Sequence, residues 1–84
     1  MAEEEIGKVS DFFARPVVAA IELTGRLRAG DRIRIKGHTT DIELTADSIQ
    51  VDNVNVLEAN DGQAVGLKVT DRVRRGDTVY RISG

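Results

Sequence analysis

Three basic side chains repeat at every second position of one short segment. Arg32, Arg34 and Lys36 alternate with Ile33 and Ile35, which is the pattern of a strand with one charged face and one apolar face. Residues two apart on a strand are separated by about 6–7 Å, so each cation can meet a separate phosphate of a nucleic-acid chain. The same pattern is typical of a solvated strand that resists edge-to-edge pairing. The segment therefore predicts either a phosphate-binding row or an exposed charged strand.

Further arginines lie beside two Gly-Asp turns. Arg28 precedes Gly30-Asp31, and Arg74 and Arg75 precede Gly76-Asp77. Glycine readily adopts the positive φ that a tight turn requires, and aspartate bonds nearby backbone. The planar guanidinium suits bidentate contact with phosphate. We expect these cations to converge at one rim of the domain and to contact RNA. The predicted RNA-binding residues are Arg28, Arg32, Arg34, Lys36, His38, Arg74 and Arg75.

His38 is the only histidine in the chain, and it lies in a polar segment with Thr39, Thr40 and Asp41. One histidine with scattered carboxylates does not supply the ligand set of a zinc site. Nucleophilic catalysis needs a nucleophile, a base and an orienting acid, and no such set stands out. We therefore expect no enzyme activity, no metal and no cofactor. His38 is then a turn residue, or it contacts RNA at the margin of the site.

The balance of charges limits the kinds of partner. The chain has 84 residues, with 12 Lys and Arg against 14 Asp and Glu and a formal net charge of −2. This balance argues against binding polyanions through a bulk positive field. Three acids are consecutive at Glu3–Glu5, and such a like-charge run is typical of a solvated tail. We predict a disordered acidic tail over residues 1–5 and a single domain over residues 6–84.

Absent residue types narrow the setting further. The sequence contains no cysteine, which excludes disulfides, a thiol nucleophile and cysteine-bound zinc. No apolar run approaches the roughly 20 residues that span a bilayer, and the acidic N-terminus is unlike a secretory signal peptide. We expect a cytoplasmic protein with no membrane partner.

Alternation of apolar and polar residues recurs along the chain, and no segment sustains a helical period. Asp52-Asn53 interrupts the alternation and predicts a turn or bulge, while the last strand could bury either Val79 or Tyr80. Short strands at this spacing indicate a small closed barrel of six to eight strands, with an open sandwich as the alternative. The expected strands lie within residues 6–13, 17–23, 31–36, 42–44, 49–51, 54–56, 65–69 and 78–82.

The order of these signals resembles the second domain of elongation factor Tu and related translation GTPases. The resemblance is carried by four segments in order: residues 25–37 (GRLRAGDRIRIKG), 48–51 (SIQV), 62–69 (GQAVGLKV) and 73–79 (VRRGDTV). It implies an all-β Greek-key barrel that, in elongation factor Tu, helps to hold the aminoacylated end of transfer RNA. The chain lacks a Gly-x-x-x-x-Gly-Lys-Ser/Thr loop, so we expect no bound nucleotide.

A second resemblance rests on residues 36–41 (KGHTTD). This segment looks like small stand-alone elongation-factor-like proteins and like the C-terminal barrel of the U32 peptidase-like family. Two hypotheses follow. The first is a non-catalytic translation-factor-like barrel that binds transfer RNA or the ribosome. The second is a protein-interaction module that works beside a separate enzyme such as a U32 peptidase-like protein.

The second hypothesis predicts an apolar patch for a protein partner. Phe12 and Phe13 are adjacent, and neighbouring residues of a strand point to opposite faces. One of the two phenylalanines therefore belongs to the core. The other packs under the acidic tail or is exposed to a partner.

Overall fold

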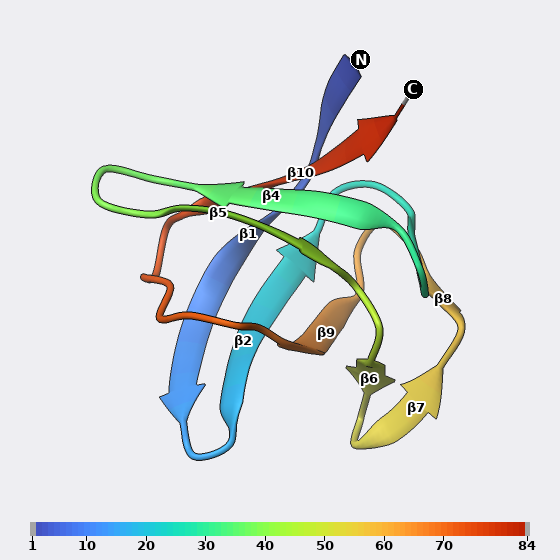
Figure 1. Cartoon of the computed structure of the whole chain (residues 1–84). Helices are drawn as coiled ribbons and strands as arrows, with labels where there is room; N and C mark the ends of the chain where they lie inside the picture. The colour runs from blue at the N-terminus through green and yellow to red at the C-terminus, as the bar shows by residue number, and fades with distance from the viewer. Residues whose placement is uncertain (1, 84) are drawn as a thin grey trace.

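The computed structural model describes residues 2–83, and these residues form ten β-strands (Figure 1). The all-β prediction is confirmed. Two of the strands have only two residues each, too few to show an alternating pattern, which explains why the sequence predicts six to eight. The strands are β1 (Ala2–Ala14), β2 (Val17–Leu23), β3 (Leu27–Arg28), β4 (Arg32–Lys36), β5 (Asp41–Thr45), β6 (Ile49–Val51), β7 (Val54–Val56), β8 (Glu58–Ala59), β9 (Ala64–Lys68) and β10 (Thr78–Ser83).

Eight strands join in one antiparallel sheet, in the order β5-β4-β10-β1-β2-β9-β6-β7, while β3 and β8 pair separately. The sheet curls around a single interior (Figure 1). Among the described residues, no hydrogen-bonded ladder joins the two outer strands, β5 and β7. Closure of the predicted Greek-key barrel is therefore not confirmed, and β5 is left with one unpaired side.

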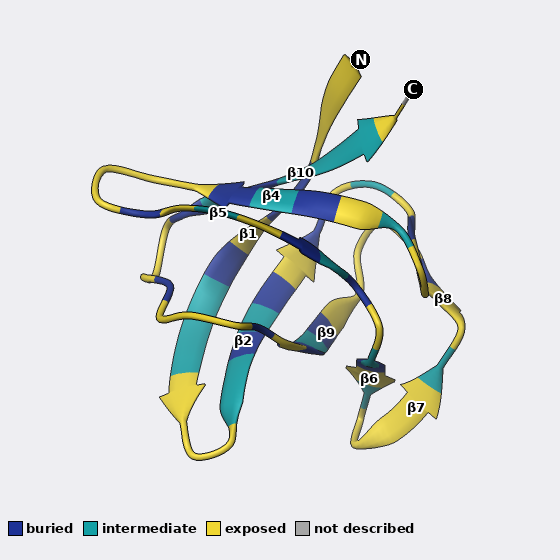
Figure 2. Cartoon of the chain, viewed as in Figure 1, coloured by how far each residue is buried: buried dark blue, intermediate teal, exposed yellow. Residues whose placement is uncertain are grey.

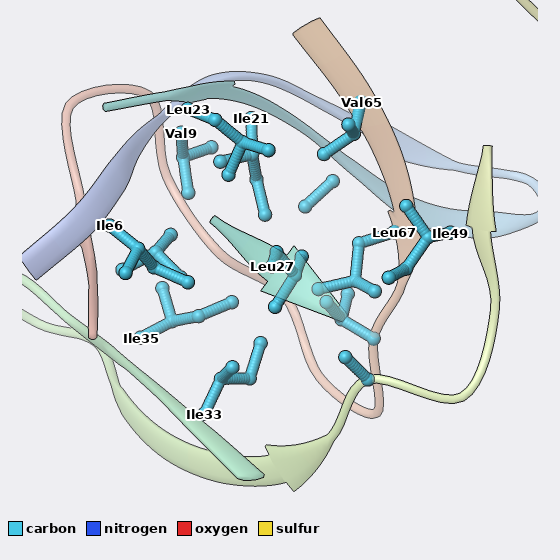
Figure 3. Close-up of a cluster of buried hydrophobic side chains, with 14 of the residues drawn as sticks. Ile6, Val9, Ile21, Leu23, Leu27, Ile33, Ile35, Ile49, Val65 and Leu67 are labelled. Atoms are coloured by element: carbon cyan, nitrogen blue, oxygen red, sulfur yellow. The ribbon is translucent and has the colours of Figure 1, made fainter. Parts of the chain in front are cut away.

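Apolar residues that alternate along the strands form the core. On β4, Ile33 and Ile35 are fully buried, while Arg32 and Lys36 are exposed (Figure 2). This arrangement confirms the predicted faces of that strand. On β10, Val79 is the buried residue and Tyr80 is half-buried on the opposite face. The labelled core side chains of Figure 3 come from six strands and converge on one interior.

The start of the chain differs from the predicted tail. Residues 2–5 belong to β1 and pair with β10, with Glu3 opposite Ile82 and Glu5 opposite Tyr80. The carboxylates of Glu3 and Glu4 approach Arg34 and Arg81 at 2.8 Å. Residues 2–5 thus gain main-chain partners on β10 and opposite charges on β10 and β4. The sequence alone shows only the mutual repulsion of three consecutive carboxylates. Met1 of the predicted tail and Gly84 of the predicted domain lie outside the described residues.

The turns follow the predicted chemistry. Asp52 and Asn53, at φ 51° and 64°, form the two-residue connection between β6 and β7, which is the left-handed geometry that hairpins favour. Gly30 and Gly76 both adopt φ 94°. No helix within residues 2–83 has the length and apolar character needed to cross a membrane.

Candidate functional site

The two Gly-Asp turns lie at opposite ends of the β4–β10 pair. These strands run antiparallel, with Lys36 opposite Thr78 and Arg32 opposite Ile82. The first turn leads into Arg32, and the second leads into Thr78. Four residue steps along a strand separate the two ends by about 13 Å. The predicted convergence of the arginines at one rim is therefore wrong, because antiparallel pairing places the starts of neighbouring strands at opposite ends.

Carboxylates surround the cations on the outer face of β4. Arg34 Nη1 lies 2.8 Å from Glu3 Oε2, and Arg34 Nη2 lies 3.4 Å from Glu43 Oε1. Arg34 Nε is 3.4 Å from Asp41 Oδ1, without the alignment of a hydrogen bond. Arg32 Nε lies 3.1 Å from Glu43 Oε2. Two of the three cations of the predicted phosphate-binding row, Arg32 and Arg34, thus face three carboxylates, and a phosphate would have to displace these acids.

Arg28 is paired in a similar way. Its Nε lies 3.2 Å from Glu58 Oε1, and the two residues face each other across the short β3–β8 pair. Arg26 Nε lies 3.7 Å from the same Glu58 oxygen, so one carboxylate serves two arginines there. Arg32 and Arg34, which face three carboxylates, contribute little free positive charge to any site. Each such exposed ion pair stabilises the fold by about 0–1 kcal/mol. These pairs therefore explain the charge pattern but contribute little to the free energy of unfolding.

The other predicted cations gather at the opposite end of the molecule. Lys36, Arg74 and Arg75 are exposed there, and His38 lies in the exposed loop between β4 and β5. Gly37 of that loop packs against Asp77 of the second turn, which holds the two basic segments together. The structure therefore brings together four of the seven predicted residues.

Lys8 belongs to the same cluster, although it is not among the seven predicted RNA-binding residues. Lys8 of β1 is opposite Thr78 of β10, which is in turn opposite Lys36 of β4. The two lysines thus lie on one face, about 10 Å apart across two strand spacings. Nothing in the local sequence of Lys8 indicates this row. We call Lys8, Lys36, Arg74 and Arg75 the basic end. Acids border it, because Glu22 and Asp41 lie opposite Lys8 and Lys36 in the strand ladders and Asp11 Oδ1 lies 3.8 Å from Arg75 Nη2.

The structure also decides between the two adjacent phenylalanines. Phe12 is half-buried against the core, and the guanidinium of Arg72 lies 5.8 Å from the centre of its ring. Phe13 is 52% exposed. The aromatic residue that is free to contact a partner is therefore Phe13, at the tip of the β1–β2 hairpin.

Phe13 borders a surface groove of about 450 Å³, which we call the Phe13 groove. Its floor follows from the sheet register, because Gly66 of β9 lies between Ala20 of β2 and Gln50 of β6. The absent side chain at Gly66 keeps the floor low, as a mid-strand glycine indicates. The lining residues are Phe13, Arg15, Pro16, Val18, Ala20, Gln50, Asp52, Asn53, Ala64, Val65 and Gly66.

The lining of the groove has more apolar than polar residues. These residues come from the β1–β2 hairpin, the β6–β7 hairpin and β9. Within the described part of the chain, no three His, Asp or Glu side chains lie together in a way that could hold a metal ion. Of this lining, the sequence indicates only the phenylalanine pair, because the groove joins segments that are far apart in the chain.

The chain is similar in sequence to parts of larger proteases. It is 43% identical over 77 residues to an uncharacterized protease of Methanocaldococcus jannaschii. The aligned region covers 90% of this chain and 19% of that protein. It is 35% identical over 78 residues to a collagenase of Porphyromonas gingivalis, which covers 90% of this chain and 22% of that protein. The chain thus spans about a fifth of the length of these curated relatives. No family model matches it.

The fold is also found in a solved structure. The C-terminal domain of a protein named as a U32 peptidase, from Geobacillus thermoleovorans, superposes with a TM-score of 0.89 at 17% identity. The match covers 95% of this chain and 93% of that domain. The chain therefore has the fold of this C-terminal domain, as the second resemblance predicted.

Proposed function

We propose that this chain is a non-catalytic accessory domain that works with a U32 peptidase-type catalytic unit. The supporting observation is the 43% identity to a segment that makes up 19% of a protease. That segment corresponds here to one folded unit with its own core. The fold also matches a domain solved separately from the rest of a U32 peptidase, which supports the proposal of a folded unit distinct from the catalytic one.

The Phe13 groove is the surface that suits this role. An exposed aromatic side chain beside an apolar groove is typical of protein contacts, in which a few aromatic anchors carry much of the binding energy. Phe13 is 52% exposed, and its main chain belongs to the β1–β2 hairpin, where it pairs with Val18. We infer that the groove contacts the catalytic unit or the polypeptide that the unit acts on.

A segment exchange tests this proposal. The matching 77 residues of the Methanocaldococcus jannaschii protease are deleted, or replaced by this chain, and peptide hydrolysis is measured. We expect the replacement to recover activity that the deletion loses. With Phe13→Ser the recovery should fall about tenfold or more. Leu57→Ser is the matched control, since Leu57 is 82% exposed and lies outside the groove. The proposal would be contradicted if the protease that carries this chain hydrolysed peptide no faster than the protease that lacks the segment.

A second candidate function is RNA binding through the basic end, as the resemblance to elongation factor Tu implies. The cluster of Lys8, Lys36, Arg74 and Arg75 favours it, because cations on one surface bind phosphates with a strong dependence on salt. The contribution of Arg34 is expected to be small, since its guanidinium already faces three carboxylates.

Titration of transfer RNA at increasing salt concentration tests this second candidate. Lys36→Ala and Arg74→Ala should each lower the slope of log affinity against log salt by about one unit or less. Arg34→Ala should leave the slope unchanged. Absence of binding at low salt, or an equal effect of all three variants, would argue against the basic end as an RNA site.

A further inference from the structure

β5 is an outer strand of the sheet, and within residues 2–83 no strand pairs with one side of its backbone. It pairs with β4 from Lys36↔Asp41 to Arg32↔Thr45. Just beyond that ladder, Gly37 N–H donates to the Thr40 carbonyl at 2.8 Å. Alternate pairs of an antiparallel ladder exchange hydrogen bonds, so Ile42 and Leu44 bond toward β4. The main-chain groups of Asp41, Glu43 and Thr45 consequently point away from the sheet. The Thr45 carbonyl accepts from Asp47 N–H at 3.0 Å, so the groups open to a further strand are mainly those of Asp41 and Glu43.

A slot of about 630 Å³ lies beside this unpaired side. Its opposite wall is formed by residues 68–70, where the pairing of β9 with β6 has stopped at Leu67. Lys68 and Val69 pair with β2 on their other side, as β5 pairs with β4. Two stretches of main chain, each with one side unpaired, therefore border this slot. The lining residues are Arg32, Glu43, Leu44, Thr45, Asp47, Ser48, Lys68, Val69 and Thr70.

The charges on β5 indicate which strand could pair with it. The outward side chains of Asp41 and Glu43 remain 62% and 38% exposed despite their ion pairs. The slot itself is lined by the carboxylates of Glu43 and Asp47 and by the cations Arg32 and Lys68, so the acidic character belongs to the β5 edge, where Asp41 and Glu43 lie, and not to the whole slot. A second copy of β5 would place carboxylates opposite carboxylates, and like charges facing each other across strands are destabilising. A strand that carries lysine or arginine is favoured by the same rule.

We propose that β5 binds an extended, basic polypeptide segment of a partner protein, which adds to the sheet as a further strand. The main chain of the segment exchanges hydrogen bonds with the main chain of Glu43 and neighbouring residues, which is the usual mode of strand addition. Its outward side chains are lysine or arginine opposite Asp41 and Glu43. Its inward side chains are apolar and lie between Leu44 and Val69. This surface is separate from the Phe13 groove, and the inference does not depend on the U32 proposal.

Selection from a random dodecapeptide library on the immobilised chain tests the inference. We expect enriched peptides in which lysine or arginine alternates with apolar residues. The best peptide, synthesised with a fluorophore, is then titrated by anisotropy against Glu43→Pro and Glu43→Ala. Proline removes only an outward N–H at this edge position, so the ladder with β4 is kept. Binding should be about tenfold or more weaker for the proline variant than for the alanine variant.

A charge reversal gives a second readout that does not require proline to be tolerated. Glu43→Lys should shift the selected peptides from basic to acidic side chains, while Leu57→Ser should leave the selection unchanged. Thermal unfolding of each variant checks that it is folded. The inference is overturned if no peptide is enriched, if proline and alanine variants bind equally, or if the charge reversal leaves the preference unchanged.

Discussion

Two aspartates with the same local role differ in their surroundings. Asp31 Oδ2 accepts from Arg28 N–H at 2.9 Å, and Asp77 Oδ2 accepts from Arg74 N–H at 2.8 Å. Asp77 is only 5% exposed, whereas Asp31 is partly open to water. Because water cannot easily replace a lost partner at a buried site, the same bond matters more at Asp77.

Replacing each aspartate by alanine measures this difference. We expect Asp77→Ala to lower the free energy of unfolding by about 1–3 kcal/mol, the cost of a buried donor left without an acceptor. Asp31→Ala should cost about 0.5–1 kcal/mol. Urea denaturation of both variants provides the comparison, and equal losses would show that burial of the second turn has no energetic consequence.

A pair of glycines allows a second comparison at the residue scale. A Cβ at Gly37 would collide with the carboxylate of Asp77, whereas a Cβ at Gly66 would meet Val18 Cγ1 at 3.6 Å. Gly37→Ala should therefore cost about 1–3 kcal/mol through displacement of Asp77. Gly66→Ala should be within about 0.5 kcal/mol of the parent, because it relieves the entropic cost of glycine in a strand. Thermal unfolding that ranks the two variants in the reverse order would contradict this assignment.

At the scale of elements, β1 extends further toward the N-terminus than the acidic sequence suggests. Residues 2–5 lie beside β10, and their carboxylates join strands that are far apart in the chain. The resulting ion pairs, Glu3–Arg34 and Glu4–Arg81, connect the first element to β4 and β10. Exposed pairs contribute little individually, so the ladder of main-chain hydrogen bonds is the more important part of this contact.

Amide hydrogen exchange distinguishes a paired strand from a tail. Those amides of residues 3–5 that face β10 should exchange at least about tenfold more slowly than unstructured amides, as paired strands do. Deletion of residues 2–5 should accelerate exchange at the end of β10. If the amides of residues 3–5 exchanged at random-coil rates in the full chain, the result would support the predicted disordered acidic tail instead.

At the scale of the whole molecule, one short strand supplies a central core residue. Leu27 belongs to the two-residue β3, yet it is fully buried and lies among side chains of the large sheet (Figure 3). The β3–β8 pair therefore fills the interior of the curled sheet, which eight strands alone would leave partly empty. A chain of this size buries a small core, so each large apolar residue is a sizeable part of its stability.

Truncation of this residue should be among the most damaging changes. We expect Leu27→Ala to cost about 2–5 kcal/mol, the range for a leucine that leaves a cavity in a core. Leu57→Ala, two positions before the β3 partner Ala59, should cost less than about 0.5 kcal/mol because Leu57 is 82% exposed. Similar losses for the two variants, measured by urea denaturation, would argue against the central position of β3.

Local sequence predicts the fold class, the buried face of β4 and the turns at Gly30-Asp31 and Gly76-Asp77. Side-chain direction along a strand alternates with period two whatever its neighbours are, and the backbone preferences of glycine and aspartate are local. These features can therefore be predicted from a few consecutive residues.

Which charges meet depends on how the strands pair. The registers of β4 against β5 and β10, and of β10 against β1, placed Arg34 among carboxylates, joined Lys8 to the basic end and separated the two turns. The strand order placed the Phe13 groove across three segments and left β5 with an unpaired side. Register and strand order depend on packing between distant residues, so a charge pattern read along one strand gives the positions of cations and not their partners.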